Sequence, residues 1–439
     1  MSKKVLIVGS GGREHALGWS IAQDESVSEV LYAKGNPGTA LEEKGRNLDI
    51  DGTKEENFTA LADIVDKECI DMVIVGTEQP LVEGIVNFFN HIGYKRIFGP
   101  TTDASKTESD KFFSYRLMNY KKIPQAKSKL CFDLSSAKRA INEMVTDEGI
   151  VIKARGLTAG KGVYVCKSKK DALAKLEEHT RKYGSEVLIA ERLFGQEFSV
   201  FGISDGKNIL PLEMSVQDHK RQLDGDKGPN TGGMGAYGPA PIADRLVVKD
   251  VSEKMMKPVI DFMRKDKHEY KGFLYAAVIM TKDGPKILEY NCRFGDPEAQ
   301  PSVMMLKNGL YQPISSALEG KLGEINIEFK QGASCCVVMA SNGYPESFEK
   351  GLPIGGLKAV AEIPDVKVFH AGTATDNGKI VNSGGRVLGV TAYSENGIKD
   401  AQELAYYAVS IIDKFTRRMN DGKQVLVYRK DIAHNALKR

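Results

Sequence analysis

Three polar residues stand two positions apart near the end of a strand-like segment in the second half of the chain. Glu289, Asn291 and Arg293 alternate there with other residues, so a strand places all three side chains on one face. A carboxylate and an amide oxygen suit Mg2+ or Mn2+, whose remaining positions go to phosphate oxygens and water. A solvated edge strand is the alternative, but the apolar neighbours favour burial, and a buried unpaired acid is costly. The spacing therefore predicts a metal site, with Arg293 placed to meet a phosphoryl group.

A glycine loop that connects two other strand-like segments is the second candidate. Gly156, Gly160 and Gly162 would let its backbone come close to a polyphosphate. Lys153 on the preceding strand and Lys161 within the loop would supply positive charge. No helix follows the loop, so it is not a Walker loop, which places Gly-Lys-Ser/Thr at a helix start. We expect a flap over phosphate groups, with a hairpin turn carrying solvated lysines as the alternative.

A third cluster, GSGGREH, spans Gly9–His15 and stands between a buried strand and a helix. The amides of Gly11 and Gly12 and the side chain of Arg13 could hold an anion at that helix start. The spacing does not fit a dinucleotide site, because Glu14 stands where the third glycine is needed and no acid ends the second strand. A phosphate-bearing substrate is the functional interpretation, and a tight strand-to-helix turn is the structural one.

A chain of 439 residues predicts two to four packed units, and the pattern of elements along it divides it into three. Residues 1–103 alternate strand-like and helix-like segments, which predicts an α/β unit with a doubly wound parallel sheet. After Gly99-Pro100-Thr101, one charged helix is expected over 103–119. Residues 104–328 form the second unit, an α+β domain that contains a small lid over about 123–190. Residues 329–439 form a small α+β C-terminal domain.

A long polar stretch over 217–238 contains six glycines and little periodicity, and loops of that length in a compact domain are usually functional.

The 61 basic and 58 acidic residues give a net charge of +3, which is too balanced for a nucleic-acid surface. No apolar run reaches the roughly 18 to 20 residues of a membrane span. The start, Met1-Ser2-Lys3-Lys4, leads directly into the strand pattern Val5–Val8, which predicts a cytoplasmic protein without a signal peptide. The six cysteines lack metal-binding spacing and are expected to be small buried residues.

Several strings narrow the prediction further. They are GSGGREH, GNPGT at 35–39, QDHKR at 217–221, GPNTGGMGA at 228–236, NCRFGDPE at 291–298 and GGRVLGVTA at 384–392. The lysines, the glycine flap and the metal strand over about 105–320 resemble the ATP-grasp superfamily. Together the strings resemble the glycinamide ribonucleotide synthetase family, and they follow its order along nearly the whole chain.

The resemblance implies that ATP phosphorylates glycine and that 5-phosphoribosylamine captures the glycyl phosphate. It places Lys111, Lys153 and the flap residues Gly160, Lys161 and Gly162 at the nucleotide phosphates, Ala190, Glu191, Arg192 and Leu193 at the adenine, Glu197 at the ribose, and Lys220 and Asn230 at the border of the nucleotide. Glu289 and Asn291 would bind Mg2+ or Mn2+, and Lys153, Arg293 and Asp296 would act in catalysis. Gly11, Gly12, Arg13 and Glu78 are candidates for the ribosylamine phosphate and ribose, and Asp218, His219, Thr231, Gly232 and Gly233 for the glycine and amine end. His15 and His219 could equally be structural histidines.

One residue departs from the family pattern: Arg155 stands where Asp or Ser is usual. The positive charge of Arg155 could attract phosphate, or its side chain could point outward. Two other functions stay open, namely a ligase of the same superfamily with a different acid or amine, and a nucleotide-binding regulatory protein without turnover. The string at 228–236 argues against the first, and the complete set of Glu289, Asn291 and Arg293 argues against the second. The chain is expected to act alone, as a monomer.

Overall fold

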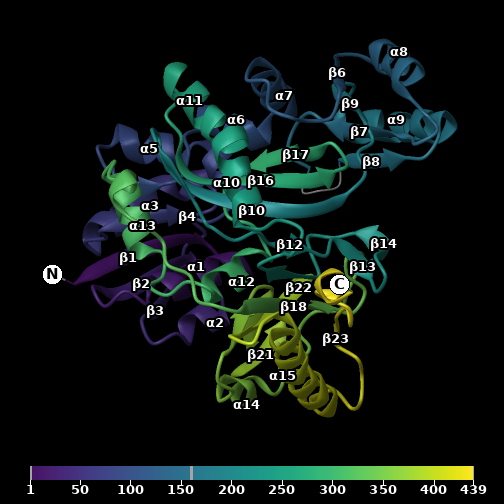
Figure 1. Ribbon diagram of the computed structural model, residues 1–439. Coiled ribbons are helices and arrows are strands. Elements are labelled where there is room, and N and C mark those ends of the chain that lie inside the picture. Colours follow the sequence, from purple (N-terminus) through teal and green to yellow (C-terminus); the bar gives the residue numbers. More distant parts are fainter. Residues whose placement is uncertain (1, 159–161, 439) are drawn as a thin grey trace.

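The computed structural model describes residues 2–158 and 162–438, so the predicted flap residues Gly160 and Lys161 lie outside the described part. Four sheets of four or more strands make up the molecule, with the small lid expected from the sequence at one end and the C-terminal sheet at the other (Figure 1). Among the described residues, no helix combines the length and the apolar character that crossing a bilayer requires.

The N-terminal sheet is parallel throughout, with the strand order β3-β2-β1-β4-β5. Its strands are β1 (Lys3–Gly9), β2 (Val27–Lys34), β3 (Gly45–Leu48), β4 (Met72–Val75) and β5 (Ile97–Phe98). Alternate residues of β1 pack on opposite faces: Val5 and Ile7 lie in one core with α1 (Gly12–Ile21), and Leu6 and Val8 lie in another with α3 (Phe58–Lys67). The predicted doubly wound parallel sheet is therefore confirmed.

The short helices α2 (Pro37–Ala40), α4 (Glu78–Glu83) and α5 (Ile85–His91) complete this unit. The single helix expected over 103–119 is two helices, α6 (Thr102–Ser109) and α7 (Lys111–Tyr120). The break lies at Asp110, whose backbone is extended and whose carboxylate accepts the amide hydrogens of Phe112 and Phe113. An aspartate in that role ends one helix and caps the next, so Lys111 becomes the first residue of α7.

The middle unit contains two antiparallel sheets. The larger has the order β11-β10-β16-β17 and consists of β10 (Gln196–Asp205), β11 (Ile209–Pro211), β16 (Lys271–Thr281) and β17 (Gly284–Asn291). The lid sheet has the order β6-β9-β7-β8 and consists of β6 (Ser128–Cys131), β7 (Ile150–Ala154), β8 (Val163–Cys166) and β9 (Val187–Glu191). Helices α8 (Leu134–Met144) and α9 (Lys169–Tyr183) pack on the lid sheet around a small core of its own (Figure 1).

The remaining helices of the middle unit are α10 (Arg245–Val251), α11 (Lys257–Lys265), α12 (Ala299–Met304) and α13 (Tyr311–Leu318). The helical stretch expected around 251–265 is continuous with α10 through one wider π-type turn, Ser252–Met256.

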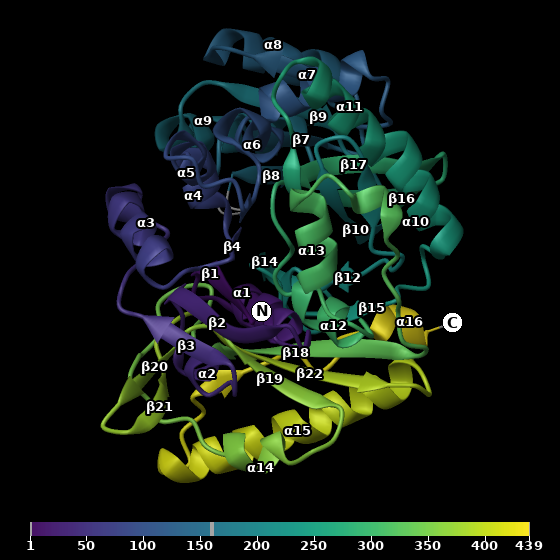
Figure 2. The ribbon, with the colours of Figure 1, turned by 90° about the vertical axis from the view of Figure 1, so that its left-hand side faces the viewer.

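The C-terminal sheet has the order β12-β15-β18-β22-β19, and β23 pairs with β18. Its strands are β12 (Gln217–Asp218), β15 (Gly235–Gly238), β18 (Ala333–Ser341), β19 (Val366–His370), β22 (Arg386–Ser394) and β23 (Leu426–Val427). The long helix α15 (Ile398–Met419) lies along one face (Figure 2). Smaller elements are α14 (Leu357–Ala361), α16 (His434–Leu437), and the hairpins β13 (Arg221–Leu223) with β14 (Lys227–Asn230) and β20 (Thr373–Asp376) with β21 (Lys379–Asn382).

Both ends of the long polar loop thus belong to the C-terminal sheet, because β12 and β15 pair with each other and β15 pairs with β18. The loop is not the irregular stretch that its composition indicates. Its backbone is held by strand pairing, so the residues that follow β12 are presented from a sheet edge.

A cluster of buried titratable groups joins the N-terminal unit to the C-terminal sheet. The Nε2 atom of His15 lies 2.8 Å from the Glu42 carboxylate, which also pairs with Lys367. The Nδ1 atom of His15 accepts the backbone amide hydrogen of His370. His15, left open between a site residue and a structural one, lies in this interface. Burial, reinforced by the proximity of His15, lowers the pKa of His370 to about 3.

This low pKa predicts an acid-sensitive interface. A histidine that is neutral when folded takes up a proton on unfolding below pH 6.5, so its contribution to stability is complete above pH 6.5 and is lost as the pH falls towards 3. We expect His370 alone to remove about 3 kcal/mol of the free energy of unfolding between pH 6.5 and pH 4. Urea unfolding at several pH values measures this loss. His370→Asn should flatten the profile, whereas His268→Asn, on the surface beside Asp103, should not. Equal profiles for wild type and His370→Asn would contradict the prediction.

Candidate active site

Strand β17 presents the predicted metal residues. Glu289 stands opposite Ala277 of β16 and Asn291 opposite Tyr275, and the register shifts just before Glu289. This bulge involves Leu288, whose carbonyl accepts a hydrogen bond from the Lys153 Nζ at 3.0 Å. Bulges re-aim side chains and free backbone groups next to active sites. The bulge therefore connects the metal strand of one sheet to β7 of the lid sheet.

Three lysines from different elements converge on Glu289. Lys111 starts α7, Lys153 lies on β7, and Lys220 follows β12. Burial raises the pKa of the Glu289 carboxyl, but these lysines together outweigh it, so that the pKa lies below its usual value. Burial lowers the pKa of Lys153, and Glu289 partly offsets that effect. An ionised acid surrounded by three cations, with a net positive field, suits a polyphosphate with a divalent cation.

A pocket lies beside this cluster between α7, the lid sheet and β17. Its lining includes Lys111, Lys153 and Glu289 together with apolar surface from Leu188 and Leu288. An apolar wall with a few charged groups at one end is typical of a nucleotide site. The two lysines and the acid belong to three segments that are distant in sequence, and the fold places them in one pocket.

A second pocket lies over β10 and β16, on the face of the sheet that also carries Glu289 and Asn291, and is lined by Glu197, Asp218, Lys220 and Tyr275, among others. The Lys220 Nζ lies 2.6 Å from the Glu197 carboxylate. Lys220 in turn lowers the pKa of Glu197. Burial and the nearby Glu298 raise the pKa of Asp218 well above its usual value, and one buried oxygen of Asp218 has no hydrogen-bond partner among the described residues. A buried acid in this state is a strong candidate to bind an amine.

Arg293 lies at the junction with the N-terminal unit. Its Nε donates to Glu78 at 3.1 Å, its Nη2 lies 3.4 Å from Glu108, and the same nitrogen lies 3.4 Å from the Asn291 amide oxygen. Burial alone would raise the pKa of Glu78, but Arg293 and Arg13 hold it at about 2. Burial raises the pKa of Glu108 despite Arg293. Arg293 is therefore tied to two acids as well as facing the predicted metal strand.

Part of the hydrogen-bonding capacity of the N-terminal glycine cluster is used by contacts within the cluster itself. The amide of Gly11 donates to the Glu14 carboxylate at 2.7 Å, and Arg13 pairs with the same carboxylate at 2.6 Å. Arg13 also lies 3.9 Å from Glu78. Gly12 faces Asp296 and the side chain of Gln300, with no room for a Cβ atom. Glu14, the residue that does not fit a dinucleotide fingerprint, therefore occupies the hydrogen-bond donors of this turn with its own carboxylate.

Asp296 is paired with a residue that the site prediction did not include. The Arg386 Nη2 donates to its carboxylate at 2.8 Å, and the Arg386 Nη1 donates to the carbonyls of Asp296 and Gly232. Burial raises the pKa of Asp296, but Arg386 and Arg13 outweigh it. Glu108, Glu298 and Tyr275 were missed as well. Arg386 and Glu298 belong to strings already quoted, GGRVLGVTA and NCRFGDPE, which was the signal available for them.

The other predicted residues lie in four places. Ala190, Glu191, Arg192 and Leu193 form the end of β9 and the connection to β10. Asn230 ends β14, and Thr231, Gly232 and Gly233 belong to the connection from β14 to β15, where Thr231 donates to the Lys220 carbonyl and Gly233 packs against Pro297 and Asp218. The His219 side chain does not enter either pocket; its Nε2 accepts the amide hydrogen of Ala433. Gly162, at the end of the flap, is buried, and its amide donates to the Thr158 hydroxyl.

Arg155 points away from the pocket. It makes a bidentate ion pair with Asp110, the cap of α7, and a second pair with Glu186 ahead of β9. Its guanidinium also lies over the Phe112 ring. The Arg155 carbonyl accepts the amide hydrogen of Lys111 at 2.8 Å. Arg155 therefore fastens the lid strand that carries Lys153 to the helix that starts with Lys111.

We expect Arg155→Ala to raise the KM for ATP about fivefold, since a partly exposed bidentate pair is worth up to about 1 kcal/mol. Arg139→Ala removes an exposed arginine from α8 of the same lid and should leave this KM unchanged. Steady-state kinetics at low and high salt test the pair, because screening should shrink the difference between wild type and variant. An unchanged KM at low salt would contradict the positioning effect.

Two antiparallel sheets that face each other across lysines and an acidic strand define the ATP-grasp class of ligases. Family comparisons agree over most of the chain. Residues 3–108 match the phosphoribosylglycinamide synthetase N domain, residues 109–299 its ATP-grasp (A) domain, and residues 334–435 its C domain. The chain belongs to the phosphoribosylglycinamide synthetase family, so the resemblance predicted from the short strings is confirmed.

Similar proteins cover nearly the full length. A phosphoribosylamine–glycine ligase of Rhodopirellula baltica is 43% identical over 420 residues, which are 93% of this chain and 94% of that protein. One of Chlorobaculum tepidum is 44% identical over 416 residues, 93% of this chain and 96% of that protein. The crystal structure of the phosphoribosylamine–glycine ligase of Thermotoga maritima superposes with a TM-score of 0.82 at 30% identity, over 98% of this chain and 100% of that one.

Proposed function

We propose that the protein uses ATP to join glycine to 5-phosphoribosylamine, giving glycinamide ribonucleotide, ADP and phosphate in purine biosynthesis. The glycine carboxylate attacks the terminal phosphorus of ATP and displaces ADP. The amine of the ribosylamine then attacks the glycyl carbonyl, loses a proton and displaces phosphate. The observation that carries this proposal is the convergence of Lys111, Lys153 and Lys220 on Glu289 in a chain of this family.

Positioning and charge neutralisation supply most of the acceleration in phosphoryl transfer. Lys111 and Lys153, which line one pocket, would hold the nucleotide phosphates. Glu197 would hold the ribose hydroxyls, and Lys220 and Asn230, which ends β14, would border the nucleotide. The connection from Ala190 to Leu193 would receive the adenine through its backbone groups. The flap residues Gly160 and Lys161 belong to the same proposal but lie outside the described residues.

Glu289 and Asn291 would hold Mg2+ or Mn2+, which when bound neutralises phosphate charge. Both offer oxygen ligands on adjacent same-face positions of β17, and the lowered pKa of Glu289 keeps it ionised. The described residues contain no group of three or more His, Cys, Asp and Glu side chains that could hold a metal. A site with two protein ligands, which leaves the other positions to phosphate and water, therefore fits this chain.

The acceptor would lie between the second pocket and the N-terminal unit. Gly11, Gly12 and Arg13 would face its phosphate and Glu78 its ribose hydroxyls, although the Gly11 amide already donates to Glu14. Asp218, with its unpaired buried oxygen, would bind an amine, and Thr231, Gly232 and Gly233 would shape the space around it. Arg293 and Asp296 would face the reacting groups from the junction of the units. Lid closure would protect the glycyl phosphate from water.

An ADP-release assay tests the proposal. Release that requires both glycine and phosphoribosylamine supports it. Release with another acid or amine would identify a different ligase of the same class, and no release with any such pair would leave a binding protein without turnover. We also propose that the enzyme is cytoplasmic and acts as a monomer. Sedimentation of the purified chain tests the monomeric state.

A further inference from the structure

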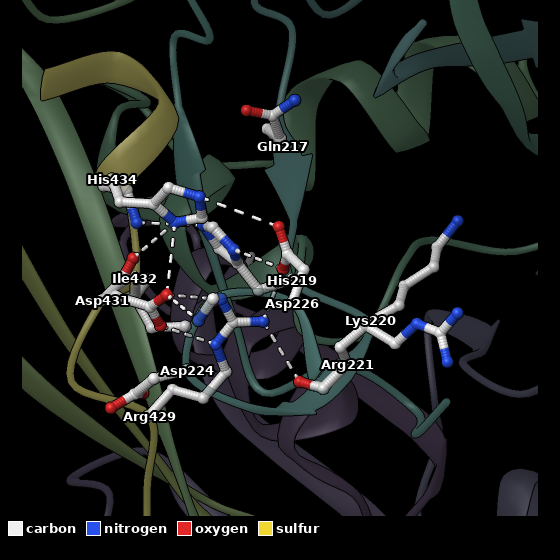
Figure 3. A network of polar contacts seen from close by, with 12 residues as sticks. Gln217, His219, Lys220, Arg221, Asp224, Asp226, Arg429, Asp431, Ile432 and His434 are labelled. Carbon is white, nitrogen blue, oxygen red and sulfur yellow. Dashed lines mark hydrogen bonds and ion pairs between the residues drawn. The ribbon is translucent and has the colours of Figure 1, made fainter. Parts of the chain in front are cut away.

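The last part of the chain crosses the back of the long polar loop. We call residues 426–434 the strap and residues 217–235 the substrate loop. The strap begins as β23, which pairs with β18, and then runs past the hairpin β13–β14 to the start of α16. Figure 3 shows strap residues Arg429, Asp431 and His434 facing His219 and Asp226 of the substrate loop. Residues 236–425 separate the two segments along the chain.

Arg429 is the centre of this contact. Its side chain is 0% exposed, and its guanidinium makes a bidentate pair with Asp431 at 2.7 and 2.9 Å. The remaining terminal nitrogen donates to the Asp226 carboxylate at 2.8 Å and to the Arg221 carbonyl at 3.2 Å. Burial lowers the pKa of Arg429, but the two aspartates more than offset that effect. A planar guanidinium that satisfies groups on both segments fixes their relative position more tightly than a point charge would.

Backbone contacts reinforce the same register. The amide of Gly225 donates to the Asp431 carboxylate, and the amide of Lys430 donates to the Asp224 carboxylate, both at 2.8 Å. A Cβ atom at Gly235 would lie 2.8 Å from the Ile432 side chain, so the strap packs directly on β15. The two segments are therefore held by reciprocal hydrogen bonds and by close packing.

His219 connects the strap to the reactive face of the loop. Its Nε2 accepts the Ala433 amide hydrogen at 3.0 Å, so the neutral ring carries its proton on Nδ1, which lies 3.9 Å from Asp226. In an extended chain, neighbours of His219 point to the opposite side. Asp218 and Lys220 indeed line the second pocket, and Figure 3 shows Lys220 directed away from the strap. The strap thus holds the back of a segment whose front carries two proposed site residues.

The strap itself is anchored on the C-terminal helix. The Tyr406 hydroxyl of α15 donates to the Arg429 carbonyl at 2.8 Å and accepts the amide hydrogen of Ile432 at 3.0 Å. The substrate loop therefore rests on a rigid element of the C-terminal sheet through the strap. Supporting contacts of this kind hold site residues in productive geometry.

We propose that the strap positions Asp218 and Lys220 for the reaction, with Arg429 and His219 as positioning residues. This inference rests on the proposed function, because it assigns a support to that site. A displacement of about 1 Å in a catalytic group can cost about a hundredfold in rate. Lys111 and Lys153 would hold the nucleotide phosphates from outside the substrate loop, which contributes only Lys220 and Asn230 to the nucleotide, so the strap should affect ATP affinity less than it affects turnover.

The test compares Arg429→Met with Arg417→Met. Arg417 also pairs with an aspartate in the C-terminal domain, Asp413, but this pair lies within helix α15 rather than at the substrate loop. At a temperature where circular dichroism shows each variant folded, Arg429→Met should lower kcat/KM for glycine and for phosphoribosylamine about 10- to 100-fold. Its equilibrium Kd for ATP should rise by a smaller factor than the factor by which kcat/KM falls. Arg417→Met should change neither quantity.

Asp226→Asn is the second variant, because it can fold where Arg429→Met does not. It removes only the loop-side charge and leaves Arg429 paired with Asp431. We expect a three- to tenfold lower kcat/KM for the two substrates and a smaller change in the Kd for ATP.

A merely structural strap would lower the melting temperature of both variants and leave kcat/KM of the folded protein at the wild-type value, which would overturn the inference. A strap variant with weakened ATP binding and unchanged kcat for bound substrates would overturn it as well. Failure of the proposed function is a separate result, since wild type itself would then release no ADP with glycine and phosphoribosylamine.

Discussion

Glu289→Gln is expected to reduce ADP release with glycine and phosphoribosylamine by at least about a hundredfold. The amide keeps the size of the carboxylate but removes the negative charge on which Lys111, Lys153 and Lys220 act. It also leaves the proposed metal site without its only anionic ligand, and losing one stabilising group at a transferring phosphoryl costs about 10²- to 10³-fold. Glu289→Ala should show the same loss. The variant should remain folded, because Glu289 belongs to the polar lining of the pocket rather than to the apolar core.

Glu253→Gln is the matched control, because Glu253 is an exposed acid of the same unit whose nearest cation is Lys249 at 3.8 Å. It should turn over like wild type. Titration with Mg2+ and Mn2+ adds a second measurement, since Glu289→Gln should need much more of either ion for half-maximal rate. Near-normal turnover of Glu289→Gln at ordinary Mg2+ concentration would exclude the metal assignment.

Arg293→Met is expected to have the largest effect on stability, with a loss of about 3 to 5 kcal/mol in the free energy of unfolding. The arginine lies between Glu78 and Glu108, and its removal leaves two close acids without their shared cation. Glu108 is 8% exposed and also accepts the Cys292 amide hydrogen at 2.8 Å, so it cannot turn to solvent without losing that bond. Activity should fall as well, because the Asn291 oxygen lies against the same guanidinium.

A double-mutant cycle separates the charge effect from packing. Glu108→Gln removes one of the two unpaired acids, so Arg293→Met with Glu108→Gln should be more stable than Arg293→Met alone. Urea unfolding at pH 7 measures each free energy. If the double variant is less stable than the single one by the full cost of Glu108→Gln in the wild type, the two residues do not interact and the explanation is wrong.

Local patterns predicted the elements that carry the site. The local pattern predicted a strand over 286–292, and β17 covers Gly284–Asn291. The alternation of strands and helices over 1–103 predicted the parallel sheet. The short strings predicted the family, which the matches over residues 3–299 and 334–435 confirm. The division at 103 and 328 and the roles of individual site residues remain predictions.

The helix expected over 103–119 was wrong because one residue overrode the pattern. Helical periodicity and charge continue through Asp110, but its carboxylate caps the amides that follow it. Capping competes with helix continuation through single hydrogen bonds. A periodicity pattern averaged over a longer window does not detect such a local contact.

The sequence by itself determined the chemistry and the local elements: the types and spacing of Glu289, Asn291 and the glycine loop, the strand periods, and the family strings. Only the tertiary structure decided the partners. It pairs Arg155 with Asp110 and Glu186, turns His219 towards Ala433, and brings Arg386 to Asp296. The physical reason is the range of the forces involved. Periodicity and turn chemistry act over a few residues, whereas these partners lie from 31 to 214 positions apart and meet only after the sheets have packed.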